Sequence, residues 1–111
     1  MKSKKKKVVI TMGDPAGIGP EVIAQALVQK KLSRLADFIV VGDENVFSRY
    51  MPDQTMWPDF VHVEETSLKK LKPGKPTTAS GYAALCFLQQ AVALIQAGKA
   101  DALVTAPLSK E

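Results

Sequence analysis

Short apolar runs and longer amphipathic segments alternate along this chain. The apolar runs are rich in Val, Ile and Phe, a composition typical of strands that are buried on both faces of a parallel sheet. They predict strands at 8–10, 38–42, 60–63 and 102–105. Between them, apolar positions recur at helical spacing and predict helices at 20–31, 43–50 and 82–97. This alternation predicts an α/β fold with a largely parallel sheet flanked by helices.

Residues at the ends of these segments suit helix termini. Pro20 fits a first helical position because its missing N–H is not needed there, and Glu21 complements the helix dipole. Asp43 and Ser80 are expected N-caps of the second and third helices. Gly98 is expected to end the third helix. That helix is apolar on most of its surface, so we expect it to be covered on more than one side.

The segment 11–21, between the first strand and the first helix, has a specified backbone shape. It contains three glycines and two prolines, of which Gly17, Gly19 and Pro20 are expected to shape the turn. The spacing alone is compatible with a well-formed turn or with a ligand loop that offers backbone N–H groups at a helix N-terminus. It is not a standard dinucleotide fingerprint, because Val22 stands where the third glycine belongs.

A second polar loop, 105–110, follows the last strand. Ligands in α/β proteins gather at the carboxyl ends of parallel strands. If the first and last strands are neighbours, the two loops lie side by side, and Asp14 and Lys110 sit at one cleft. Lys110 could bind a carboxylate or phosphate there, whereas an exposed loop lysine is the alternative that the spacing leaves open.

The positive charge of the chain is concentrated at its start. The 111 residues, 46% of them hydrophobic, suffice for one domain or part of one. The net charge is +4, and residues 2–7 hold five of the 15 basic residues, leaving ten against 11 acidic ones. We expect 1–7 to be a basic disordered tail and no nucleic-acid arm, because no aromatic residues interleave the lysines. No apolar run approaches the ~20 residues of a membrane span, so no membrane partner is expected.

Few side chains suit metal or nucleophilic chemistry. His62 is the sole histidine and alternates with apolar residues on an expected strand, so we expect a structural or surface role. Cys86 lies in the apolar helix and is expected in the core, and a single cysteine fits a reducing cytoplasm. Trp57 is expected to anchor packing. No cluster of His, Cys or acidic residues suits a metal site, so none is predicted in this segment.

Three stretches resemble a known family. The sequence from Ile10 to Glu21, the run from Asp101 to Lys110 and the apolar helix between Gly81 and Gly98 are similar to the 4-hydroxythreonine-4-phosphate dehydrogenase family. The opening also resembles the Gly-Asp-Gly-Ile-Gly-Pro-Glu sequence of isocitrate and isopropylmalate dehydrogenases, which share the broader fold. The resemblance covers 8–111 and implies the N-terminal, incomplete part of such a dehydrogenase.

This resemblance implies an NAD-dependent oxidation, with decarboxylation, of 4-phosphooxy-L-threonine to 3-amino-2-oxopropyl phosphate in pyridoxine 5′-phosphate biosynthesis. It further implies a cytoplasmic homodimer, a small phosphorylated substrate and a divalent metal (zinc, magnesium or cobalt) whose histidine ligands lie outside this segment. By the same resemblance, Gly13, Asp14, Pro15 and Ala16 border the cofactor, and Lys110 binds substrate.

Three other functions are compatible with the sequence. The first is a dehydrogenase that acts on 4-phosphorylated threonate or erythronate. The second is a non-catalytic binding or dimerisation domain. The third is a phosphate acyltransferase-like enzyme, which has a related fold but a different opening loop. Because the metal ligands are implied to lie elsewhere, we expect this segment alone to be inactive.

Overall fold

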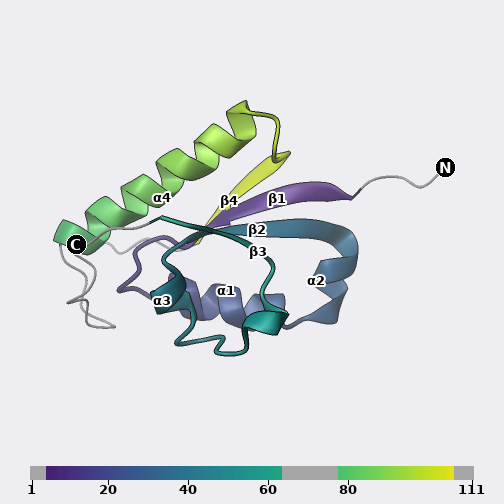
Figure 1. The fold of residues 1–111 in the computed structure, drawn as a ribbon, viewed down its shortest axis with the longest axis horizontal. Coiled ribbons are helices and arrows are strands. Elements are labelled where there is room, and N and C mark those ends of the chain that lie inside the picture. The colour runs from purple at the N-terminus through teal and green to yellow at the C-terminus, as the bar shows by residue number, and fades with distance from the viewer. Residues whose placement is uncertain (1–4, 64–77, 107–111) are drawn as a thin grey trace.

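The computed structural model describes residues 5–63 and 78–106, and its centre is a parallel β-sheet (Figure 1). In these residues the sheet has four strands in the order β3-β2-β1-β4. All neighbouring strands run parallel, which confirms the predicted α/β class. The strands are β1 (Lys6–Thr11), β2 (Ala36–Gly42), β3 (Asp59–His62) and β4 (Ala102–Thr105).

β1 begins two residues earlier than the apolar run predicts. Lys6 and Lys7 pair with the start of β2. The backbone N–H of Lys7 donates to the Asp101 carboxylate, and the Asp101 N–H donates to the Lys7 carbonyl, both over 2.8 Å. The last two lysines of the expected tail therefore belong to the strand, because β2 and Asp101 supply partners for their backbone. Residues 1–4 lie outside the described residues.

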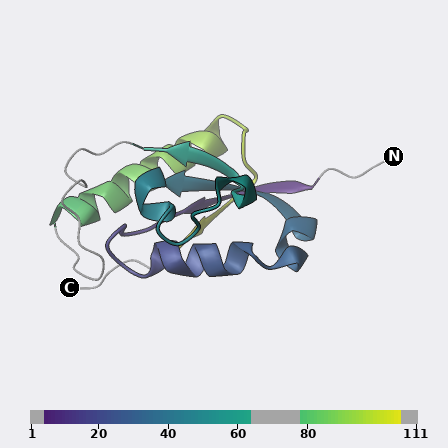
Figure 2. The same cartoon turned by 60° about the horizontal axis from the view of Figure 1, so that its bottom comes forward.

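Helices cover both faces of the sheet. α1 (Gly19–Leu27) lies against one face and α4 (Thr78–Gln96) against the other (Figure 2). The single helix predicted for 20–31 is wrong, because Gln29 adopts an extended backbone with ψ of 114°. No helix in the described part of the chain is both long and apolar enough to cross a membrane. The remaining helical segments are α2 (Lys30–Leu35), α3 (Glu44–Phe47) and the 3₁₀ helix η1 (Gln54–Met56).

Of the predicted helix-end residues, all except Ser80 hold the expected positions, including Glu21 in the first turn of α1. Pro20 lies at the start of α1. Asp43 caps α3, because its Oδ1 accepts hydrogen bonds from two backbone N–H groups over 2.8 and 3.1 Å. Gly98 follows α4 with φ of 74°, a conformation that costs glycine little. The prediction for Ser80 is wrong, because α4 begins earlier, at Thr78.

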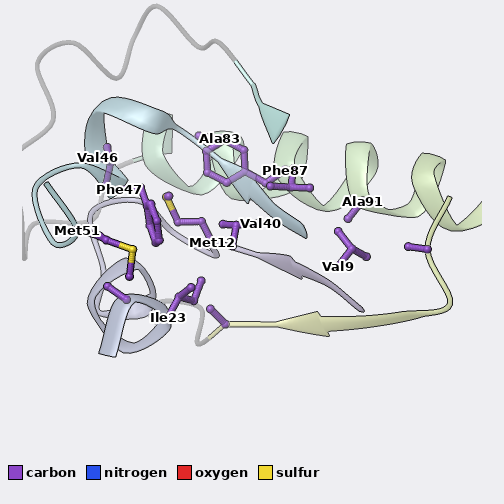
Figure 3. Close-up of a cluster of buried hydrophobic side chains, with 14 residues drawn as sticks. Val9, Met12, Ile23, Val40, Val46, Phe47, Met51, Ala83, Phe87 and Ala91 are labelled. Carbon is purple, nitrogen blue, oxygen red and sulfur yellow. The ribbon is translucent and has the colours of Figure 1, made fainter. Parts of the chain in front are cut away.

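The core fills the spaces between the helices and the sheet. Figure 3 shows Phe87 and Ala91 of α4 beside Val9 and Val40 of the sheet, and all four side chains are fully buried. Ile23 of α1 belongs to the same cluster. Because this core is continuous, the carboxyl ends of the central strands are held in a fixed position relative to both α1 and α4.

Trp57 anchors the segment between α3 and β3. Its indole N–H donates to the Met51 carbonyl over 2.7 Å. Its ring centroid lies 5.0 Å from those of Phe47 and Phe60. Edge and tilted contacts of this kind stabilise aromatic clusters beyond area burial alone. The expected packing role of Trp57 is confirmed.

β4 and the outer face of α4 are more exposed than predicted. β4 pairs with β1, and within residues 5–63 and 78–106 no strand pairs with its other edge. Val104 is therefore 49% exposed. On α4, Leu85 is 48% exposed and Cys86 is only half-buried. The prediction of a buried last strand is wrong for the described structure, because β4 lies at the edge of the sheet. The predictions of a core cysteine and of a helix covered on several sides are also wrong there, because α4 packs through one face.

Candidate functional site

The candidate site lies at the end of β1, where successive strands are added first on one side of β1 and then on the other. From β1 the sheet extends to β2 and β3 on one side, and β4 lies on the other side of β1. α1 follows β1 on one face, whereas α4 precedes β4 on the opposite face (Figure 2). The carboxyl ends of β1 and β4 therefore form a topological switch point, the place where open α/β sheets bind ligands.

The ends of β1 and β4 are in direct contact. Thr11 and Thr105 are register partners. The backbone N–H of Ala106 donates to the Thr11 carbonyl over 3.1 Å. The expectation that the loops after the first and last strands start side by side is confirmed as far as Ala106.

A tight turn leads from β1 into α1. The Met12 N–H still donates to the Val41 carbonyl over 2.9 Å, and Gly13 then turns the chain with φ of 74°. This φ lies in the left-handed region, where a residue with a Cβ is strained. The glycine at position 13 thus aims the residues that follow toward the N-terminal end of α4.

Asp14 is the centre of this turn. Its side chain is 3% exposed, and its Oδ1 accepts a hydrogen bond from the Ala16 N–H over 2.8 Å. Its Oδ2 accepts a hydrogen bond from the Ser80 hydroxyl over 3.1 Å. Its backbone carbonyl accepts one from the Gly17 N–H over 2.9 Å. The two bonds to the carboxylate oxygens compensate for removing this group from water.

Ser80 is the residue that sequence reasoning missed. It is the third residue of α4 and is fully buried, and its hydroxyl points to Asp14 instead of capping the helix. Serine is favoured at N-caps, so the local pattern favoured that role. The two residues are 66 positions apart, and no local signal in the sequence joins them.

Gly19 holds α1 close to the ends of the strands. A Cβ on Gly19 would come 2.3 Å from the Met12 carbonyl oxygen and 3.1 Å from the Cβ of Ala106. Glycine is therefore required for the first residue of α1 to pack against the chain that leaves β1 and β4. The expected shaping role of Gly19 is confirmed.

A pocket of about 230 Å³ opens beside these elements. Its polar part comes from the strand ends and the turn, and its apolar part comes from the exposed side of α4. Gly81, next to Ser80, contributes open space, since a Cβ there would have no neighbour within 4 Å. The lining residues are Thr11, Asp14, Gly81, Ala84, Leu85, Leu88 and Thr105.

The predicted site residues divide into three groups. Asp14 lines the pocket. Gly13, Pro15 and Ala16 are buried in the turn and do not line this pocket. Lys110 lies outside the described residues. The turn therefore brings one of its four predicted ligand-contacting residues to the pocket wall.

His62 and Asp43 serve the fold. The Nδ1 atom of His62 accepts a hydrogen bond from the Glu44 N–H over 3.0 Å, so His62 joins Asp43 in capping α3. The expected structural role of the histidine is confirmed. Among residues 5–63 and 78–106, no three His, Cys, Asp or Glu side chains are grouped so that they could hold a metal ion.

Comparison with known families identifies the chain. The family model described as pyridoxal phosphate biosynthetic protein PdxA matches residues 8–111. This chain belongs to the PdxA family. The match covers the turn, the switch point and α4, and the family resemblance expected from the sequence is confirmed.

Curated relatives of this chain differ in the substrates that their names give. The 4-hydroxythreonine-4-phosphate dehydrogenase of Geobacter metallireducens is 34% identical over 100% of this chain and 38% of its own length. The D-threonate 4-phosphate dehydrogenase of Pectobacterium atrosepticum is also 34% identical, over 96% of this chain and 38% of its own length. The chain thus spans 38% of the length of these relatives.

Solved structures share the fold over almost the whole chain. A 4-hydroxythreonine-4-phosphate dehydrogenase from Burkholderia phymatum superposes with a TM-score of 0.81 at 28% identity, over 97% of this chain and 38% of that one. A terephthalate 1,2-cis-dihydrodiol dehydrogenase from Burkholderia xenovorans gives a TM-score of 0.79 at 28% identity, over 96% of this chain and 35% of that one. The expected dehydrogenase fold is confirmed for this part.

Proposed function

We propose that this chain forms the N-terminal part of a PdxA-type enzyme that oxidises a small phosphorylated hydroxy acid with NAD. The observation that carries the proposal is the pocket at the switch point, where Thr11, Asp14 and Thr105 face an apolar wall from α4. A site with a few convergent polar groups and an apolar wall suits a small ligand. The names of the curated relatives supply the reaction class.

The pocket has room for only a portion of the proposed ligands. Its volume of about 230 Å³ is below the ~300–1,000 Å³ of typical small-molecule sites. A dinucleotide together with a phosphorylated substrate needs more room than this. We therefore expect residues 1–111 alone to show no turnover, with the remaining walls supplied by other parts of the natural enzyme.

The first substrate candidate is 4-phosphooxy-L-threonine, oxidised and decarboxylated to 3-amino-2-oxopropyl phosphate. The second is 4-phosphorylated threonate or erythronate. Relatives named for a 4-phosphorylated threonine and for a 4-phosphorylated threonate are equally identical to this chain, at 34%, so identity does not choose between them. Both candidates carry a phosphate, and Lys110 is our proposed contact for it or for the carboxylate.

The cofactor and metal enter the proposal differently. NAD would accept the hydride, and our proposal places the turn 13–16 beside it. The described residues contain no group that fits a metal ion, so we derive no step through a metal held by this segment. If the reaction uses a divalent metal, its ligands belong to other parts of the enzyme.

Two further features belong to the proposal. We propose a homodimer, by likeness to the family, and a cytoplasmic location, because a single cysteine and a biosynthetic role suit a reducing compartment. Size-exclusion chromatography with light scattering on the natural enzyme tests the first feature. A monomer at micromolar concentration would contradict it.

The experiment that tests the function is an assay of NADH formation. The natural enzyme that carries this sequence is supplied with NAD, a divalent metal and each phosphorylated substrate in turn. We expect NADH with 4-phosphooxy-L-threonine, and NADH with phosphorylated threonate or erythronate alone would select the second candidate. No NADH with any of them would contradict a PdxA-type dehydrogenase. The segment 1–111 serves as the inactive control.

A further inference from the structure

We propose that Ser80 is a positioning residue of the ligand site, acting through Asp14. This inference rests on the proposed function, because it assigns Ser80 a role in that same pocket. Ser80 does not line the pocket. Its hydroxyl instead holds the carboxylate that does, and it connects α4 to the turn after β1.

The geometry makes Asp14 a bridge between two pocket walls. One carboxylate oxygen accepts the Ala16 N–H within its own turn, and the other accepts the Ser80 hydroxyl from α4. Both side chains are buried, at 3% exposure for Asp14 and 0% for Ser80. Hydrogen bonds between buried groups of this kind fix a separation, because neither partner can turn to water instead.

Gly81, the residue after Ser80, shows which part of the pocket the Ser80–Asp14 bond affects. Gly81 lines the pocket from α4. Thr11, at the end of β1, lines the same pocket from the sheet. The Ser80–Asp14 bond therefore fixes the turn after β1, and the carboxylate that lines the pocket, against the N-terminal end of α4. Losing it leaves the carboxylate held by the Ala16 N–H of its own turn and removes the bond that ties this turn to α4.

The bond also helps to explain why the fold tolerates a buried carboxylate at position 14. Hydrogen bonds to charged groups contribute more than those between neutral groups, and a buried acceptor that loses its donor bears a desolvation cost. Removing the Ser80 hydroxyl should reduce kcat/KM by roughly 10- to 100-fold if the pocket depends on the turn. Because the turn is proposed to border NAD, most of this loss should appear in the KM for NAD.

A double-mutant cycle in the natural enzyme tests the inference. The variants are Ser80→Ala, Asp14→Ala and the double variant, with kcat and the KM for NAD measured for each. If Ser80 acts through Asp14, the double variant should be no worse than Asp14→Ala alone. Should Asp14→Ala not fold, Asp14→Leu, which keeps a similar shape without either oxygen acceptor, replaces it in the same cycle.

A control variant distinguishes an effect on the position of Asp14 from a general loss of stability. Ser48→Ala removes a hydroxyl that bonds the Asn45 carbonyl over 2.8 Å at the end of α3, away from the pocket, and should leave the KM for NAD unchanged. Losses that multiply in the double variant, or a Ser80→Ala enzyme within twofold of the parent, would overturn the inference. An inactive parent enzyme would instead count against the proposed function.

Discussion

Gly19 lies against the backbone of Met12 so closely that a Cβ on Gly19 would come within 2.3 Å of the Met12 carbonyl oxygen. The neighbour is backbone and cannot swing aside. Gly19→Ala should therefore shift α1 away from the strand ends and destabilise the protein by about 1–3 kcal/mol. Urea denaturation of the purified protein measures this difference.

A second glycine provides the control for that change. A Cβ on Gly81 would have no neighbour within 4 Å, and alanine is the better helix former. Gly81→Ala should therefore leave stability unchanged or raise it by up to about 1 kcal/mol. Equal stability losses in the two variants would contradict the close approach of Gly19 to Met12.

Asp43 should stabilise α3 as its N-cap. Its Oδ1 accepts the N–H groups of Asn45 and Val46, which otherwise lack partners in the first turn. Asp43→Ala should destabilise the protein by about 1 kcal/mol, measured by urea denaturation. The exposed Asp37 of β2 offers the control, and its change to alanine should cost less than about 0.5 kcal/mol. Equal effects would argue against the cap.

The Thr55 hydroxyl, with the Thr55 backbone N–H, holds the pKa of Asp53 below its ordinary value of 3.8. The pKa of Asp53 is lower in the folded protein than in the unfolded chain. Ionised Asp53 therefore stabilises the fold at pH values above about 3.8, and this contribution is lost as the pH falls through the pKa of the folded state. Thr55→Ala should raise the pKa of Asp53 in an NMR titration, whereas Thr55→Ser keeps the hydroxyl and should not. An unchanged pKa in Thr55→Ala would refute this cause.

The sequence predicted the elements of the fold because their signals are local. The β-branched run at 38–42, the cap at Asp43 and the terminator at Gly98 each depend on neighbouring residues. The break at Gln29 was missed, since nothing in the amphipathic pattern of 20–31 marks it. The exposure of Val104 was also missed, because an apolar run does not reveal whether its strand has neighbours on one side or on two.

The candidate site was predicted in outline and not in detail. Strand order follows from packing among distant segments, so the contact between Thr11 and Thr105 could be stated only as a condition. Asp14 lines the pocket, and its contact with a ligand stays a prediction. Its partner Ser80 is expected from the sequence to cap a helix, a role that serine also fills. The role of Lys110 stays a prediction, because it lies outside the described residues.

In our proposal, the pocket between the turn after β1 and α4 is part of the NAD site of a PdxA-type enzyme. Gly81→Leu tests it most directly, because leucine keeps the helix and fills open space in the pocket. Calorimetric titration of NAD into the natural enzyme and this variant should show affinity weakened at least about tenfold, with thermal stability retained. Equal NAD affinity in a folded Gly81→Leu enzyme would contradict the claim.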